Sequence, residues 1–525
     1  MRAHPRGASL GGDATAQILA TECQALIDDY WGRYVAIVRD EVAGRTYVLR
    51  DPTGTLPCFI ACHDNVHFVF SDLETCVRLR FWRFSINWRY VELFVPYPAL
   101  QIRATGLNEV TEVQLGERLR LDAAGVERRL LWDPVEIAQR GLIEDPAVAA
   151  CAVHETVKLC VHAWASLHSS IVHNLSGGLD SSIVLSCLVD APNRPAIAAL
   201  HFYWPESGED ERRFARMAAS HAKVDVLESA LAAGSVDLRR MLEVRPGPRP
   251  WFYTYDLEQS PHEIEIAAAR GATALFSGAG GDGLFMQPRA DLAVTDYLYR
   301  RGVNARVMRV ALASARITKT SMWPILRRGL REHFRRPARP LYVGTDELRT
   351  LIPAAVLESA RNDDSIVHPW LADAIDLPPG LRWHILCLSV PPAFYDCFDH
   401  GREVERSFAL LSQPLMELCL RIPLDVWISG GRDRAVARRA FATDLPPTIV
   451  RRTAKGTINR HGRMLVEANE AFLREVLLEG LLVQKGLLDR ARLAAFLSPQ
   501  RSPHSLEYTE VLRQYLCTEV WLRRW

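Results

Sequence analysis

Short runs of β-branched and aromatic residues alternate with turn residues over the first 135 positions. These runs occupy residues 33–39, 46–49, 58–61 and 66–70, and a further stretch follows at 109–121. Turn formers such as Ala43-Gly44 and Asp51-Pro-Thr-Gly54 separate them. Short runs bounded by glycine, proline, aspartate and asparagine are typical of strands joined by hairpins. The pattern therefore predicts antiparallel sheets in this part of the chain.

The hydrophobic pattern changes its period after about residue 145. Apolar positions spaced near 3.6 residues predict a helix over 146–167, after which strand-like and helical runs alternate. The predicted strands are 170–175, 195–203 and 273–276, and helices begin at 180 and 210. This alternation predicts a parallel sheet covered by helices. From about residue 303 onward the pattern is mainly helical, with breaks at paired prolines.

Composition narrows the class of protein. The 525 residues include 63 Lys+Arg and 62 Asp+Glu, and the resulting net charge of +1 argues against bulk nucleic-acid binding. The chain has neither a long uncharged apolar run nor the apolar core of a secretion signal, so no membrane span is expected. Its 11 cysteines are scattered and form no CxxC pair, which predicts reduced thiols in a cytoplasmic protein. Few of the basic residues are lysines, so each lysine in a candidate site is informative.

The first candidate ligand-binding segment is Ser176-Gly-Gly-Leu-Asp-Ser-Ser182. It follows a predicted strand and begins a predicted helix. Gly177 and Gly178 let the backbone approach an anion, and serine hydroxyls and helix N–H groups can donate to it. Asp180 supplies a hard oxygen ligand for Mg²⁺. The segment matches neither the GxxxxGK[ST] loop nor the GxGxxG pattern. It indicates a polyphosphate site rather than an ordinary glycine turn.

A second glycine-rich turn, Ser277-Gly-Ala-Gly-Gly-Asp-Gly283, follows the predicted strand 273–276. Its single acid, Asp282, is expected at the same carboxyl edge of the sheet as the first loop, where ligands bind in open α/β sheets. Glycine turns are common, so the second turn indicates a ligand site only in combination with the first loop.

Together these motifs resemble the ATP pyrophosphatases, and among them the asparagine synthetase-like enzymes. SGGLDSS is similar to the pyrophosphate loop, and the second turn is similar to SGxGGDE, with Gly283 in place of Glu. The resemblance implies an α/β fold, in which a parallel-sheet, adenine nucleotide alpha hydrolase-like synthetase domain has a helical C-terminal part. It implies ATP and Mg²⁺ as cofactors, with Asp180 and Asp282 as the metal ligands. The implied ATP-binding residues are Leu175, Ser176, Gly177, Gly178, Asp180, Ser181, Ser182, Leu200, Ser277 and Gly278.

Two downstream segments extend the resemblance. Residues 405–423 are similar to the family's E-x-R-x-P-[FL]-L-D segment, with Ala409 and Ser412 in place of Pro and Asp, and residues 445–456 are similar to its LP-x-x-[IV]-x-x-R-x-K-x-G segment. The resemblance implies that Glu405 handles the attacking amine and that Lys455 is catalytic. A lysine there would stabilise the negative charge that builds up during both attacks. The alternatives are an ion-paired helix acid at Glu405 and a surface lysine at Lys455.

Residues 30–40 and 49–57 look like the glutaminase domain of asparagine synthetases. Working glutaminases carry a nucleophilic cysteine directly after the initiator Met, whereas this chain has Arg2 there and its first cysteine is Cys23. We therefore expect residues 1–135 to form an antiparallel β-sandwich of glutaminase (Ntn) type without its nucleophile. Residues 145–525 are expected to form the synthetase domain. The amine would then come from a source other than glutamine.

Three branches of the family fit the chain: ammonia-dependent asparagine synthetases, β-lactam synthetases and lasso peptide macrolactam synthetases. Residues 391–402, 410–415 and 430–434 look most like lasso cyclases. These enzymes activate an Asp or Glu side chain of a precursor peptide for attack by its N-terminal amine. The resemblance implies a precursor peptide as substrate. It allows a leader peptidase, a leader-recognition protein and peripheral contact with an exporter as further partners. A tRNA-modifying pyrophosphatase and a non-catalytic adapter are alternatives from other classes.

The segment 299–339 is dense in arginine. Its two interpretations are a solvated helical surface and a surface for a peptide substrate or a partner protease.

Overall fold

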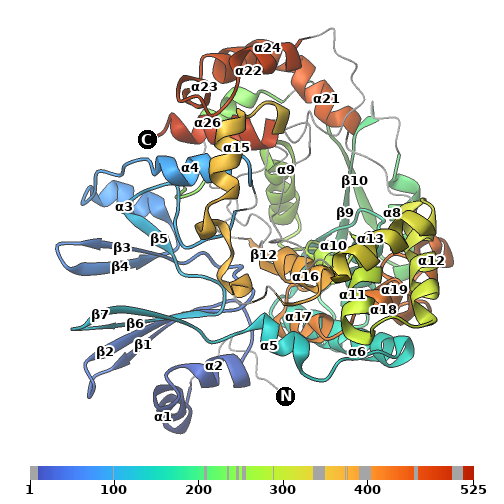
Figure 1. Cartoon of the computed structure of the whole chain (residues 1–525). Helices are drawn as coiled ribbons and strands as arrows, with labels where there is room; N and C mark the ends of the chain where they lie inside the picture. Colours follow the sequence, from blue (N-terminus) through green and yellow to red (C-terminus); the bar gives the residue numbers. More distant parts are fainter. Residues whose placement is uncertain are drawn as a thin grey trace.

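The structure is a computed structural model of the chain (Figure 1). It describes residues 10–98, 100–205, 210–232, 234, 236–243, 247–250, 256–287, 289–334, 349–372, 374, 376–389, 404–453, 459–498 and 512–525. Across these ranges, no helix is long and apolar enough to cross a membrane.

Two antiparallel sheets form the N-terminal part, drawn in blue and teal in Figure 1. The first has the order β1-β2-β6-β7, with β1 (Val35–Asp40), β2 (Arg45–Arg50), β6 (Glu117–Asp122) and β7 (Gly125–Leu130). The second has the order β4-β3-β5, with β3 (Phe59–His63), β4 (Val66–Phe70) and β5 (Val110–Glu112). A small core of Val48, Cys58, Ile60, Val113 and Leu119 draws on both sheets. The structure thus has the antiparallel strands that the pattern predicts, while the likeness to a glutaminase domain stays a prediction.

The rest of the chain is built on a five-stranded parallel sheet in the order β10-β9-β8-β11-β12. The strands are β8 (Ser170–Asn174), β9 (Ala196–Tyr203), β10 (Val226–Ala230), β11 (Ala274–Ser277) and β12 (Glu405–Ser407). The predicted parallel α/β sheet is therefore confirmed. The sequence pattern missed β10 and β12, because β10 carries polar residues and β12 is a three-residue strand with two charges. Pairing with neighbouring strands, rather than a pattern of their own, places these two strands in the sheet.

Helices cover both faces of this sheet. On one face α6 (Pro146–Ala165), α7 (Leu179–Val189) and α17 (Gln413–Leu420) share the main core with Ile171 and Phe276. On the other face α9 (Asp256–Ala269) packs over Val172 and Leu275. The start of α6 follows from its sequence, because Pro146 takes the first helical position and the Asp145 carboxylate accepts from the next two N–H groups, at 2.7 and 3.0 Å.

Further helices complete the chain, and from about residue 303 the described structure is helical apart from β12. The remaining α-helices of the first half are α1 (Gly12–Ala20), α2 (Gln24–Asp29), α3 (Leu73–Leu79), α4 (Trp88–Phe94), α5 (Pro134–Gln139) and α8 (Arg212–Ala222). Those of the second half are α10 (Gly281–Leu284), α11 (Ala293–Arg301), α12 (Arg306–Thr318), α13 (Met322–Phe334), α15 (Ala354–Arg361), α16 (Pro379–Ser389), α18 (Leu424–Trp427), α19 (Ala435–Ala440), α20 (Pro447–Arg451), α21 (Asn459–Ala468), α22 (Glu470–Leu478), α23 (Leu481–Gln484), α24 (Arg490–Phe496) and α26 (Cys517–Leu522). Short 3₁₀ turns are η3 (Leu238–Glu243), η4 (Ala290–Leu292), η5 (Asp364–Ile366), η6 (Pro369–Leu371) and η7 (Ser429–Gly431), and η8 (Leu512–Leu516) is a π-helical turn.

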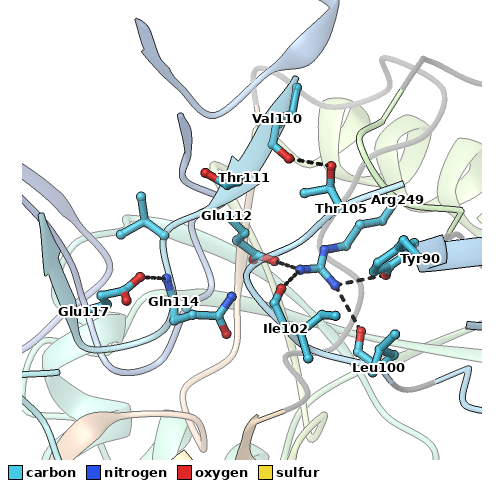
Figure 2. Close-up of polar contacts among 12 residues, drawn as sticks. Tyr90, Leu100, Ile102, Thr105, Val110, Thr111, Glu112, Gln114, Glu117 and Arg249 are labelled. Atoms are coloured by element: carbon cyan, nitrogen blue, oxygen red, sulfur yellow. Dashed lines mark hydrogen bonds and ion pairs between the residues drawn. The ribbon is translucent and has the colours of Figure 1, made fainter. Parts of the chain in front are cut away.

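A buried arginine joins the two parts of the chain (Figure 2). Arg249 precedes α9 in the sequence, but its side chain reaches into the N-terminal part and is 5% exposed as a residue. It contacts Tyr90 Oη and Leu100 O, both at 3.0 Å, as well as Ile102 O and the Glu112 carboxylate. Glu112 also binds Arg50 at 2.7 Å. Removing one partner of a buried ion pair typically costs ~3–5 kcal/mol, so these contacts hold the two parts together tightly.

Candidate active site

A cavity of about 750 Å³ lies at the carboxyl edge of the parallel sheet. Ser277 at the end of β11 lies opposite Asn174 at the end of β8, so the two glycine-rich turns begin side by side. The order of the sheet changes direction between these strands, which is where open α/β sheets bind ligands. The predicted site residues that line the cavity are Leu175, Ser176, Gly178, Asp180, Ser181, Leu200, Ser277, Gly278 and Asp282.

The first turn is shaped to receive an anion. Gly178 caps α7 without a side-chain hydrogen bond, so the N–H groups of the first turn face outward from an 11-residue helix. The Gly178 N–H donates to Ser176 Oγ at 3.2 Å, and Ser176 Oγ lies 3.0 Å from Ser181 Oγ. This arrangement collects hydroxyl and amide donors at one end of a helix dipole.

Gly177 and Ser182 belong to this turn but do not line the cavity. Gly177 has φ +73°, and a Cβ there would lie 2.5 Å from the backbone nitrogen of Ala215 in α8. The Ser182 hydroxyl donates to Gly178 O at 2.7 Å and is buried. These two residues therefore shape the turn and leave the ligand-facing positions to their neighbours.

The second turn packs directly on the first turn of α7. A Cβ at Gly278 would lie 2.4 Å from the backbone nitrogen of Ser181, a distance that no side chain allows. Glycine is therefore required at position 278 for the two turns to touch. This close approach brings Asp180 and Asp282 together at the cavity.

Arg434 lies between these two carboxylates. Its Nη1 donates to Asp180 Oδ2 at 2.8 Å and to Asp282 Oδ1 at 3.0 Å. Burial would lower the Arg434 pKa, but Asp180, Asp282 and Asp433 outweigh it and raise the pKa. In the sequence, the run 430–434 is visible only as part of the resemblance to lasso cyclases, and nothing there assigns Arg434 to the site.

The same pair of carboxylates fits a divalent cation. Both already share one cationic nitrogen, and Mg²⁺ prefers carboxylate oxygens at about 2.0–2.1 Å with several waters or phosphate oxygens as further ligands. Among the described residues there is no group of three or more His, Cys, Asp or Glu side chains that could hold a metal on its own. A metal here would therefore take its remaining ligands from a bound phosphate and from water.

The cavity is cationic overall. Its acids are Asp180, Glu211, Asp282 and Asp433, and its cations are Arg316, Lys319, Arg432, Arg434, Arg438 and Arg452. Six cations against four acids favour a polyanion. The arginine-dense segment contributes Arg316 and Lys319, and Lys319 was visible in the sequence only as one of few lysines.

Other arginines of the segment 299–339 are paired with acids away from the cavity. Arg300 and Arg301 bind Glu144, and Arg328 binds Glu332 at 2.7 Å and Asp291 at 2.8 Å. Positions 335–339 of this segment lie outside the described residues.

Arg452 attaches the chain after α20 to the first glycine-rich turn. Its Nη1 donates to Gly177 O at 3.3 Å, and Nη2 pairs with Glu211. The guanidinium also lies over the Phe214 ring, 3.8 Å from its centroid. Lys455 follows three residues later and lies outside the described residues, as do Arg2 and the segment 391–402. The role predicted for Lys455 stays a prediction.

Glu405 does not line the cavity. It lies on a strand rather than a helix, opposite Ala274, and this position is roughly 10 Å before the carboxyl edge at ~3.3 Å per residue. Its carboxylate pairs with Arg33 of the N-terminal part at 3.3 Å. Glu405 thus lies outside the set of residues that line the cavity with Asp180 and Asp282, and its role with the amine stays a prediction.

A buried histidine beneath the loop predicts pH-dependent stability. His173 Nε2 lies 2.8 Å from Ser181 O, and burial lowers the pKa of His173 from 6.5 to about 4. The unfolded chain therefore binds a proton near pH 6.5, whereas the folded chain binds it only near pH 4. We expect the stability that His173 contributes to be present above pH 6.5 and to fall by about 3 kcal/mol as the pH drops to 4.

Urea unfolding between pH 7 and 4.5 measures this effect. A His173→Gln variant should lose less stability on acidification than the wild type, and the exposed His221→Gln serves as the control. Parallel pH profiles for His173→Gln and the wild type would show that His173 is not the group responsible.

Comparison with known proteins gives one family match. The asparagine synthase family model matches residues 153–367 and 391–523, which together exceed half of the chain. No curated protein matches the chain.

Two solved structures show only slight likeness. The allosteric regulatory enzyme of purine biosynthesis is 12% identical over 43% of this chain and 55% of that chain, with a TM-score of 0.16. A glutamine-dependent NAD⁺ synthetase from Acinetobacter baumannii, in complex with ADP, is 11% identical over 64% of this chain and 85% of that chain, with a TM-score of 0.21. The chain spans about half the length of the first of these structures.

Proposed function

Because the chain belongs to the asparagine synthase family, we propose that it is an ATP-dependent carbon–nitrogen ligase that forms an amide bond through an adenylate. The observation that carries this proposal is the contact between the two glycine-rich turns. That contact brings Asp180 and Asp282 to one cation position in a cavity rich in arginine. A nucleoside triphosphate needs such a combination of helix N–H groups, cationic side chains and a metal site.

The proposed nucleotide site follows the cavity. The polyphosphate is placed at Ser176, Gly178 and Ser181, where hydroxyl and amide donors converge. Leu200, Ser277 and Gly278 line the same cavity and are assigned to the adenosine end. Asp180 and Asp282 would hold Mg²⁺, which when bound neutralises charge on the polyphosphate.

The proposed reaction has two steps. A carboxylate oxygen forms a bond to the α-phosphorus of ATP, and the bond from that phosphorus to the bridging oxygen breaks, so that pyrophosphate leaves. An amine nitrogen then forms a bond to the acyl carbon, AMP leaves, and the amine gives up one proton. Negative charge develops in both steps, and the cations of the cavity together with Lys455 are proposed to stabilise it.

The amine is proposed to come from a source other than glutamine. Of the four cysteines of residues 1–135, Cys62 is exposed and the other three are buried; burial raises the pKa of the Cys23 thiol to about 11, that of Cys58 to about 12 and that of Cys76 to about 11. A nucleophilic thiol needs the opposite shift. The N-terminal sheets are therefore proposed to act as a structural support, joined to the synthetase part through Arg249 and Glu112.

Within the family, we assign the chain to the macrolactam branch. The acceptor would be an Asp or Glu side chain of a precursor peptide, and the nucleophile would be the N-terminal amine of the same peptide, giving a lasso peptide. The resemblance at residues 430–434 supports this assignment, and that run contributes four residues to the cavity. A leader peptidase and a leader-recognition protein are the further partners that we propose for such a substrate.

Product mass tests the choice of substrate. The full chain is incubated with ATP, Mg²⁺ and a candidate linear core peptide, and in parallel with free aspartate and an ammonium salt. We expect the peptide to lose the mass of one water molecule and free aspartate to remain unchanged. Conversion of aspartate to asparagine with no change in the peptide would instead assign the chain to the ammonia-dependent asparagine synthetases.

A further inference from the structure

Arg434 occupies the position in which the two carboxylates would hold a metal. One nitrogen, Nη1, contacts both Asp180 and Asp282, at 2.8 and 3.0 Å. The side chains of Arg434 and Asp180 are only 10% and 12% exposed, so solvent screens this contact little. Asp282 is 58% exposed and gives the site its open side.

The backbone and a second acid hold Arg434 in this place. Its φ is +50°, in the left-handed region, and it directly precedes α19. Such a conformation costs roughly 1–3 kcal/mol for a non-glycine residue and persists only when its surroundings fix it. Asp433 accepts from Arg434 Nε at 3.1 Å and is itself held by Arg438 at 2.9 Å. Asp433 therefore keeps Arg434 at the cavity whether or not its Nη1 contacts Asp180 and Asp282.

A guanidinium and a metal ion exclude each other at this position. Mg²⁺ would need oxygens at about 2.0–2.1 Å, well inside the space that Nη1 now fills. A polyphosphate, in contrast, offers the guanidinium new oxygens in the same cavity, since arginine binds phosphate through paired N–H donors. Binding of the metal and binding of the nucleotide would therefore both move Arg434 away from Asp180 and Asp282.

We propose that Arg434 is an exchangeable counter-ion of the metal site: it balances Asp180 and Asp282 when no metal is bound, and it turns to the polyphosphate when Mg²⁺ arrives with ATP. The inference rests on the proposed roles of Asp180 and Asp282. It makes the binding of Mg²⁺ and nucleotide cooperative. Mg²⁺ releases Arg434 for contact with the polyphosphate, and the polyphosphate draws Arg434 away from the metal ligands. Mg²⁺ alone would bind weakly, since it must displace a buried cation.

Calorimetric titration of the full chain with Mg²⁺ tests this inference, first with Mg²⁺ alone and then with a non-hydrolysable α,β-methylene analogue of ATP present. We expect Arg434→Gln to bind Mg²⁺ alone on the order of 10- to 100-fold more tightly than the wild type, as loss of a charge-assisted contact allows. The enhancement of Mg²⁺ affinity by the analogue should shrink in this variant. The control is Arg439→Gln, which removes the same charge from an exposed position on α19 and should behave as the wild type.

The outcomes separate this inference from the proposed function, because the readout needs no turnover. Unchanged or weaker binding of Mg²⁺ alone by Arg434→Gln would overturn the inference even if the wild type forms AMP. Tighter binding would support it even if no ligase product is found. Should Arg434→Gln fail to fold, Arg434→Met serves as a second neutral variant that keeps an unbranched apolar stem, and affinity for Mg²⁺ equal to that of the wild type would likewise count against the exchange.

Discussion

An Asp180→Asn variant is expected to lose ATP-dependent turnover by about 10³-fold or more. The change keeps the size of the side chain but removes a charge that, in the proposed function, holds Mg²⁺ between the two turns. A metal supplies several kcal/mol of charge stabilisation to phosphoryl transfer, and each 1.4 kcal/mol corresponds to about a factor of ten in rate. The rate of pyrophosphate release at saturating ATP measures the loss.

The matched control lies on the same helix. Asp190 caps the far end of α7, is 57% exposed and pairs with Lys158, so Asp190→Asn should keep nearly full turnover. Asp180→Asn should also need more Mg²⁺ for half-maximal activity. Turnover within threefold of the wild type would mean that Asp180 does not carry the metal.

A Lys455→Met variant is expected to lose turnover by about 10²- to 10³-fold while folding normally. Methionine keeps the length of the side chain but removes the ammonium that is proposed to stabilise negative charge in both steps, and loss of one such group typically costs this much. Initial rates of AMP formation, together with the thermal unfolding midpoint, separate the chemical loss from a folding defect.

Lys485 provides the control for Lys455, because it is exposed and lies over the Trp88 ring, 4.8 Å from its centroid. Lys485→Met should leave the rate unchanged. Binding of ATP should also survive in Lys455→Met, since the glycine-rich turn proposed to bind the polyphosphate is unchanged. Equal rates of AMP formation for both lysine variants would mean that Lys455 is a surface residue. The negative charge of the two steps would then be stabilised by the arginines of the cavity alone.

Three strands of the parallel sheet and the two turns were predictable from sequence, because each of them carries its own local pattern, whereas β10 and β12 do not. The strand at 170–174 and the glycine run after it carry their own pattern, and the same holds for the strand at 274–277. The shared carboxyl edge then follows from parallel pairing alone. The contact of Gly278 with Ser181 is the physical result of this arrangement.

Arg434 could not be predicted, because its place depends on contacts remote in sequence. Asp180 lies 254 positions away and Asp282 lies 152 positions away. No local pattern distinguishes Arg434 from the many other arginines of the chain. Its left-handed φ and its contact with Asp433 become visible only in the folded structure.

For Glu405 the sequence motif was visible, but the position of the residue in the fold was not. The motif does not give the register of the strand. Pairing with Ala274 places Glu405 at the start of β12, and Arg33 of the N-terminal part binds its carboxylate. Strand register depends on long-range pairing and packing, which a single segment does not encode.

The products of ATP test the central claim most directly. The full chain is incubated with Mg²⁺, α-³²P-labelled ATP and the linear core peptide; the labelled nucleotides are separated, and the unlabelled pyrophosphate and inorganic phosphate are measured in parallel by enzyme-coupled assays. The account predicts AMP and pyrophosphate in equal amounts, formed only with the peptide and not by Asp180→Asn. Labelled ADP with inorganic phosphate as the main products would contradict adenylation, and with it the proposed function.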